Sequence, residues 1–276
     1  MKFKVGLQGY RDMYHRAIFD EDAPGITAST KIDKFNLNTG LFVLNDDEVN
    51  ENASQTFGTI DIKRKSENNT VKGSLMYYTI QDELSIFYLG AGTDITLNNN
   101  IFGGHFIYNM GEDKLTDQDI NGFFGYAYAG RKIMDNLKLK LKFGYTPSKY
   151  DADSKTMFYS IKPNAVGYGL EYFYRGSVYD YNALTRNYQG ILGEGNMVGV
   201  LNASYKFLYA NLGMIYATNE DIDDKHIGNE IDLGITTEVA EKIKFKAVYA
   251  MFMPCKDSWS ENETASELSM QLNYKF

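Results

Sequence analysis

The sequence predicts an all-β protein, a transmembrane antiparallel up-and-down β-barrel of about 14 strands. Three observations predict it: a period-two alternation of apolar and polar residues, a sorting of connections into short and long, and a composition that favours strands. Tyrosine (22) and glycine (25) are frequent and proline (4) is scarce. No run reaches the roughly 20 apolar residues that a membrane-spanning helix requires. We expect one domain over residues 1–276.

The alternation is clearest at 137–145, where leucines alternate with Lys138, Lys140 and Lys142. One face of this strand is apolar and the other is basic. Similar patterns at 243–253 and 267–276 indicate that lipid covers all the apolar faces. The predicted strands are 2–12, 24–33, 35–45, 56–66, 70–81, 84–97, 100–111, 120–133, 137–148, 197–207, 208–219, 227–240, 243–253 and 265–276.

The connections support a barrel in the bacterial outer membrane. Those after every second strand are tight, and those between them are mostly longer, as expected for short periplasmic turns and long extracellular loops. The tight turns fall at Asp33-Lys34, Glu67-Asn68-Asn69, Asn98-Asn99, Asp135-Asn136, Phe207-Leu208 and Glu241-Lys242. A soluble β-sandwich or a lipocalin-like barrel has no reason to sort its loops in this way, and no blade motif recurs as in a propeller.

The longest connection, residues 150–196, is rich in tyrosine and glycine. Loops of this length are usually functional or disordered, and aromatic residues disfavour disorder. We expect it to be extracellular or to fold into the pore. At the start of the sequence, the residues Met1–Val5 already alternate between polar and apolar as a strand does. We therefore expect a mature form whose export signal is removed.

The final strand carries apolar residues on one face and ends on Phe276. It resembles the terminal strands of outer-membrane proteins, which implies recognition by the barrel-assembly machinery. Lipid and lipopolysaccharide are the other partners that a barrel predicts. The net charge of -8 argues against nucleic acid as a partner. The sequence gives no oligomeric state, although an oligomer is compatible with it.

Charge is unevenly distributed between the predicted faces. The predicted pore-lining residues are basic in excess: Lys63, Lys65, Lys72, Lys138, Lys140, Lys142, Lys206, Lys244, Lys246, His105, Asp61 and Asp232. Rings of basic side chains favour anions, which predicts mild anion selectivity. The alternative is that these lysines only keep the periplasmic rim solvated. External loops are acidic, and either form a solvated face or bridge the divalent cations of lipopolysaccharide.

Catalysis and metal binding find no support in the three histidines, which form no spaced ligand set. His15 and His226 fall in predicted external loops beside acids, and such histidines are usually solvated. His105 lies on the lumenal parity, where a polar pore-lining group is commoner than a base. The sequence therefore predicts no enzyme, cofactor or metal.

Two segments resemble the alginate-export-like porins of Gram-negative bacteria: Arg11–Ile26, a strand end with an acidic loop that returns through a glycine, and Ile227–Leu233. Members of that family are typically longer, so the chain looks like a short member or one without the N-terminal strands. The family's polyanion-binding arginines do not carry over, because lysines predominate here and arginines are few, such as Arg64 and Arg131.

Three functions are compatible with these patterns. The first is a porin, a passive diffusion channel for small hydrophilic or anionic solutes. The second is a dedicated conduit, either an exporter of an acidic, alginate-like polysaccharide or a barrel that sheaths a partner protein. The third is an adhesin or other structural barrel with a filled lumen.

Overall fold

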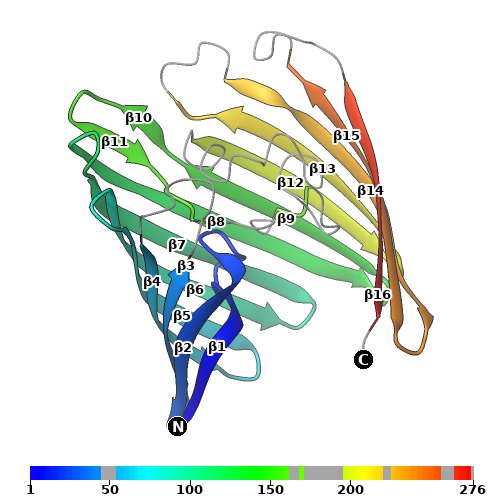
Figure 1. Cartoon of the computed structure of the whole chain (residues 1–276). Coiled ribbons are helices and arrows are strands. Elements are labelled where there is room, and N and C mark those ends of the chain that lie inside the picture. The colour runs from blue at the N-terminus through cyan, green and yellow to red at the C-terminus, as the bar shows by residue number, and fades with distance from the viewer. Residues whose placement is uncertain (45–53, 162–167, 171–194, 220–224, 256–263, 275–276) are drawn as a thin grey trace.

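The computed structural model describes residues 1–44, 54–161, 168–170, 195–219, 225–255 and 264–274. They form one large β-sheet (Figure 1). Its first nine strands are β1 (Lys2–Arg11), β2 (Asp20–Ile32), β3 (Phe35–Leu44), β4 (Gln55–Lys65), β5 (Asn69–Ile80), β6 (Leu84–Leu97), β7 (Asn100–Asp113), β8 (Gln118–Met134) and β9 (Leu137–Thr146). The others are β10 (Ser148–Tyr150), β11 (Ser154–Met157), β12 (Asn196–Tyr205), β13 (Leu208–Ala217), β14 (His226–Ala240), β15 (Ile243–Pro254) and β16 (Ala265–Tyr274).

Fourteen strands follow one another in chain order, each antiparallel to the next, from β1 to β9 and then from β12 to β16. This confirms the up-and-down all-β fold and the number of strands predicted in the continuous path. The short hairpin of β10 and β11 was not predicted. It extends beyond β9, and β11 pairs in parallel with β8 at Ser154 to Thr156. β2 begins four residues earlier than expected, because Asp20 to Ala23 pair with β1.

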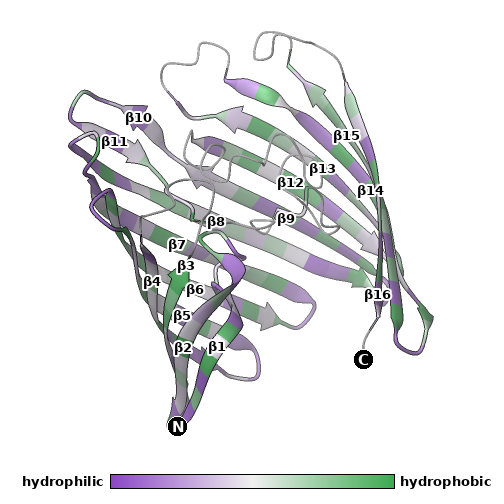
Figure 2. Ribbon diagram, viewed as in Figure 1, coloured by the Kyte–Doolittle hydropathy of each residue, from purple (hydrophilic) through white to green (hydrophobic). Residues whose placement is uncertain are grey.

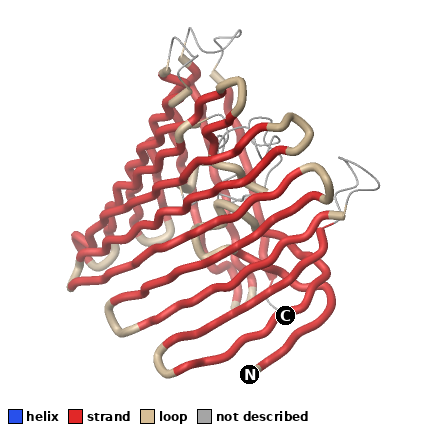
Figure 3. Tube along the Cα trace, turned by 90° about the vertical axis from the view of Figure 1, so that its left-hand side faces the viewer, coloured by secondary structure: helices blue, strands red, loops and turns tan. Residues whose placement is uncertain are grey.

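The tight connections lie at one end of the sheet, called the turn end, together with the start of β1 and the end of β16 (Figures 1 and 3). The opposite end is called the loop end. Asp33 and Asn98 open two-residue turns with φ of 52° and 53°, a conformation that Asp and Asn tolerate better than other side chains. The turn after β12 is formed by Lys206 (φ 54°) and Phe207, one residue earlier than predicted. Lys206 therefore lies in the turn and not in a strand.

The sheet curves strongly, and its first and last strands do not pair with each other among the described residues. Each of them has one hydrogen-bonded neighbour, β2 for β1 and β15 for β16. A closed ring was expected from the sequence. The structure shows an open, curved wall with a concave inner face and a convex outer face.

The outer face carries exposed apolar side chains on all fourteen strands of the path, and the alternation of hydrophobic and hydrophilic residues along the strands is visible in Figure 2. Leu141, Leu201 and Leu212 lie side by side on β9, β12 and β13, with exposed fractions of 59%, 48% and 46%. Side chains of this size and number are not left in water by a soluble protein. Hydrocarbon covers such a belt in membrane barrels.

The protein's buried side chains lie on the inner face. Phe42, Phe57 and Phe19 pack there with Tyr10, their ring centroids 5.2 to 6.2 Å apart. Further along the wall, Phe124 packs on Phe158, a residue of the long connection, with centroids 5.5 Å apart. The concave side is therefore partly filled and not an empty channel.

The two faces of β12 offer a direct test of this orientation. Leu201→Arg places a charge on the outer face in mid-strand and is expected to lower the free energy of unfolding by about 2–4 kcal/mol in lipid. Asn202→Arg, one residue away on the inner face, removes a 2.7 Å hydrogen bond to Asn211 and is expected to lower it by only about 1 kcal/mol. Urea unfolding in lipid vesicles measures both. Equal losses would contradict the assignment of faces.

Candidate functional site

The concave inner face carries the candidate site, and the first element that shapes it is the inward loop, residues 12–19 between β1 and β2. Asp12 organises this loop. Its Oδ1 accepts the amide protons of Tyr14 (2.8 Å) and Arg16 (3.1 Å), and its Oδ2 accepts those of Ile18 (2.7 Å) and Phe19 (2.9 Å). One carboxylate thus satisfies four backbone donors that would otherwise be buried without partners.

The inward loop lies against the inner wall. The Tyr14 ring packs 5.5 Å from the His105 ring on β7, and the Lys72 ammonium on β5 is 5.9 Å from its centroid. Gly90 on β6 makes this contact feasible, since a Cβ at that position would be 2.6 Å from the tyrosine ring. The prediction that this segment is an external loop is wrong, because the four hydrogen bonds to Asp12 turn it inward. His15 itself remains exposed, on the concave side of the wall.

The first described part of the long connection packs on the inward loop. Ser160 Oγ donates to the carbonyl of Ala17 (2.9 Å), and the amide of Ile161 donates to Ile18 (3.0 Å). From the wall, Tyr88 donates its hydroxyl proton to the carbonyl of Tyr159 (3.2 Å). Residues 157–161 are thereby held between the loop and the wall.

The second described part, residues 168–170, also lies on the inner face, but it contacts the strands β9 and β13 instead of the inward loop. Lys142 Nζ on β9 donates to the carbonyl of Tyr168 (2.5 Å), and Asn211 on β13 donates to that of Gly169 (2.7 Å). The side chain of Leu170 packs against Gly213 so closely that a Cβ at this position would lie 2.7 Å from it. Residues 162–167 and 171–194 of the connection lie outside the described part of the chain.

The lysines of β9 form a row on the inner face, because residues two apart in a strand project from the same side. Lys138 is exposed at the turn end. Lys140 lies over the ring of Tyr128 on β8, with its ammonium 4.3 Å from the centroid. Lys142 is bound to the carbonyl of residue 168. The row therefore runs from the turn end up to the long connection.

Lys72 is less available than the sequence pattern implied. Its side chain is 6% exposed and forms an ion pair with Asp94 on β6, with Nζ 3.4 Å from the carboxylate. Asp94 also accepts a hydrogen bond from the hydroxyl of Tyr128 (2.8 Å). Sequence reasoning missed Asp94, although it lies on the inward parity of its strand, diagonally opposite Lys72 in the register.

The remaining predicted cations lie nearer the turn end. Lys63 and Lys65 on β4 and Lys244 on β15 are exposed, and Lys246 is half-buried. Lys206 is exposed in its turn, with its ammonium 5.4 Å from the ring of Tyr205.

The two predicted acids are buried in the inner wall. Asp61 is 4% exposed and accepts hydrogen bonds from Ser74 Oγ (2.5 Å) and the hydroxyl of Tyr10 (2.9 Å). Asp232 is fully buried and accepts one from Asn211 Nδ2 (3.1 Å). Asp61 on β4 is thus bound from the adjacent β5 and from β1, and Asp232 on β14 from the adjacent β13, so neither carboxylate is presented freely to the concave space.

His105 lies at the centre of an aromatic cluster. It is 6% exposed, and its ring stacks on that of Tyr126, with centroids 5.0 Å apart. The ring of His15 lies 5.4 Å from His105 and 5.1 Å from Tyr126. His226 is remote from them, stacked on Tyr216 at the loop end of β13 and β14. Among the described residues, no three His, Cys, Asp or Glu side chains gather as a metal site would require.

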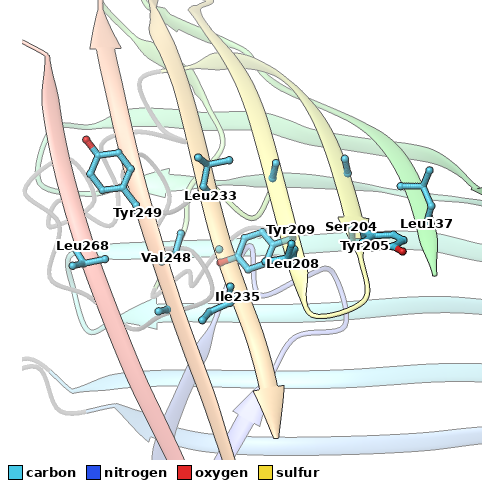
Figure 4. Close-up of a pocket in the computed structure, with 14 residues that line it drawn as sticks. Leu137, Ser204, Tyr205, Leu208, Tyr209, Leu233, Ile235, Val248, Tyr249 and Leu268 are labelled. Carbon is cyan, nitrogen blue, oxygen red and sulfur yellow. The ribbon is translucent and has the colours of Figure 1, made fainter. Parts of the chain in front are cut away.

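The outer face holds a different kind of cavity, a pocket of about 510 Å³ at the turn-end half of β9 and β12 to β16 (Figure 4). Its lining includes the small residues Ala203, Ala210 and Ala247 and larger side chains such as Leu233 and Tyr249. Its lining is almost wholly apolar, so it has no groups for chemistry on a polar substrate. Hydrocarbon chains of the membrane suit it.

An apolar convex face, an ordered antiparallel wall and a partly occupied concave face are features of the outer-membrane β-barrel fold. Three solved structures that it resembles are Acinetobacter baumannii OccAB1 (10% identity, TM-score 0.61, covering 99% of this chain and 73% of that one), Pseudomonas aeruginosa OccK11 (11%, 0.57, 99% and 76%) and the outer membrane protein OprD of Pseudomonas aeruginosa (14%, 0.55, 93% and 69%). Identities of this size show a shared fold.

The bacterial outer-membrane location that the sequence predicts agrees with this fold. No protein-family model matches the chain, and no curated protein matches it. The resemblance to alginate-export-like porins is not supported, since the similar structures are channels of the OprD and Occ type. Within the described residues, no helix has the length and hydropathy to cross a bilayer.

The role of Asp12 can be tested by substitution. Asp12→Ala leaves four amides of the inward loop without an acceptor, and is expected to raise their hydrogen-exchange rates at least tenfold, since each unpaired buried donor costs about 1–3 kcal/mol. Asp20→Asn is the control. It weakens the ion pairs of the largely buried Asp20 carboxylate with Arg11 and Arg16, whose side chains are 68% and 40% exposed. Asp20 accepts none of the four amides that Asp12 holds, so their exchange rates are expected to change less than in Asp12→Ala. Unchanged exchange in Asp12→Ala would contradict the assigned role.

Proposed function

We propose that the chain is an outer-membrane porin, a passive channel for small hydrophilic solutes that prefers anions. The observation that carries the proposal is the row of Lys138, Lys140 and Lys142 on the concave face of β9. Behind this row stands a wall whose outer face is apolar. The likeness to OprD and Occ channels supports the channel fold.

Electrostatics favours anions in this space. Lys138 and the exposed Lys63, Lys65 and Lys244 are near the turn end, and a low-dielectric wall focuses their field into the lumen. The inward acids of the described residues offset this charge only in part. Asp61, Glu230 and Asp232 are buried, and Asp94 is paired with Lys72. Glu267 is half-buried, and Glu238 is exposed opposite Lys244 in the register.

The size of permeating solutes is set by the segments that fold inward. Residues 12–19 and 157–161 contact each other, and 168–170 reach β9 and β13. These segments occupy part of the concave space at mid-height. We propose that the connection 150–196 narrows the pore in this way, and that the channel therefore passes small solutes.

The proposed partners in the membrane contact the outer face. Leu268, Met270, Leu272 and Tyr274 on β16 point outward with exposed fractions of 54% to 66%, as expected for contact with lipid and lipopolysaccharide. The same strand leads to Phe276, which lies outside the described residues. Its alternating apolar residues support recognition by the barrel-assembly machinery.

Ion selectivity in planar bilayers tests the lysine row. Replacement of Lys138, Lys140 and Lys142 by glutamate inverts the charge of the row, and the reversal potential under a salt gradient is expected to move from anion toward cation preference. Lys138→Glu alone should give a smaller shift in the same direction, because Lys138 is exposed and bound to no neighbour in the described structure.

Lys114→Glu is the matched control, since it makes the same charge change in the exposed loop between β7 and β8. It should leave the reversal potential close to that of the wild type. A triple variant with unchanged selectivity would show that the lysines only solvate the rim. A wild-type barrel that conducts no current would reject the porin, and would favour a lumen filled by its own loops or by a partner.

A further inference from the structure

The rings of His15, His105 and Tyr126 form a compact triangle on the inner wall, with centroids 5.0 to 5.4 Å apart. Two of them belong to the wall, on β7 and β8, and His15 belongs to the inward loop. His15 also approaches Tyr128, at 6.5 Å. The triangle is therefore a docking contact between a loop and the channel wall.

The docking contact involves backbone strain. His15 and Arg16 have φ of 60° and 65°, the left-handed region that residues other than glycine rarely adopt. Such strain persists only where surrounding interactions hold it, and it concentrates at functional and switching sites. Here the strained residues are held by the hydrogen bonds that backbone amides of the loop donate to Asp12, and by the ring contacts of His15.

The surroundings of His15 are unfavourable for a positive charge. The charges of Lys72 on β5 and of Lys140 and Lys142 on β9 oppose protonation of His15. Among the described residues, Asp94 on β6 is the acid whose charge favours it. Asp94 is already engaged by Lys72 and Tyr128. On β7, neither ring nitrogen of His105 has a hydrogen-bond partner among the described residues, and an imidazole carries no negative charge that would stabilise a protonated His15.

These surroundings shift the protonation of His15. Part of the residue is open to the concave space, but burial by the wall and then the charge of Lys72 lower its pKa to about 4. A released loop would restore the ordinary value near 6.5. The docked loop thus binds fewer protons than the released loop between pH 6.5 and 4. Docking is fully favourable above this window and weakens as the pH falls through it.

Asp12, the other titratable group of the loop, acts in the opposite direction. Burial raises its pKa, against the four amide hydrogen bonds that lower it. A docked acid with a raised pKa binds protons more readily than a released one, so its linkage favours docking as the pH falls. Acid release of the loop, if observed, is therefore attributable to His15.

We propose that the inward loop is an acid-sensitive gate: protonation of His15 beside Lys72, Lys140 and Lys142 releases residues 12–19 from the aromatic triangle into the lumen. The inference rests on the proposed channel function, whose regulation it describes. A released loop moves within the conducting space, so a steady current gives way to fluctuating substates. The released fraction grows by at most about tenfold for each pH unit below 6.5.

Two measurements test the gate. In planar bilayers, wild-type current is expected to be steady at pH 7.5 and to fluctuate at pH 4.5. Hydrogen exchange at the amides of Tyr14, Ile18 and Phe19, corrected for the intrinsic effect of pH, should show lower protection at pH 4.5. His15→Phe keeps an aromatic ring but cannot be protonated, and should stay steady and protected at both pH values.

His226→Gln is the control, because His226 is distant from the triangle, and it should respond to acid as the wild type does. Equal loop protection at both pH values in the wild type would overturn the gate, as would an acid response of His15→Phe equal to that of the wild type. A protein that conducts at no pH would reject the porin, whereas hydrogen exchange would still decide whether the loop is released.

Discussion

Hydrocarbon cannot hydrogen-bond to a peptide group, and the rest of this structure depends on that constraint. In the membrane, each backbone N–H and C=O of the wall has to be paired within the protein. A continuous antiparallel ladder of fourteen strands, with neighbours in chain order throughout, pairs the backbone groups between the strands, and leaves the outer edges of β1 and β16 without a neighbouring strand among the described residues. The ladder then fixes the direction of every side chain, because successive residues point to opposite faces. The apolar outer belt and the basic inner row are two results of one geometry.

The inner face borders water and not lipid, and its architecture differs accordingly. There the chain turns loops back on itself, and each returned segment brings its own means of satisfying its peptide groups. Asp12 accepts four amides of the inward loop, and Lys142 and Asn211 bind the carbonyls of residues 168 and 169. Lys142 thus serves two purposes, as a cation of the lysine row and as an anchor of the long connection.

Glycines on the inner wall complement the returned segments. Gly90 faces Tyr14, Gly144 faces Tyr168 and Gly213 faces Leu170, and a Cβ at any of the three would lie within 2.7 Å of the opposing side chain. From the sequence alone, glycines in barrel strands are expected to relieve crowding or mark bends. The structure gives the specific reason for these three, which is contact with segments distant in sequence. Period-two patterning cannot reveal this, since it describes a strand and its two faces only.

Several features could be predicted from the sequence alone because they arise from local order. The alternation at 137–145, the tight turns at Asp33 and Asn98 and the even number of strands in the path all depend on residues near each other in the chain. The assignments that needed tertiary structure were of another kind: the inward fold of 12–19, the pairing of Lys72 with Asp94, and the meeting of His15 with His105. Side-chain parity is a property of the strand. Which loop returns to which part of the wall is decided by contacts between residues up to 143 positions apart, and no local pattern encodes them.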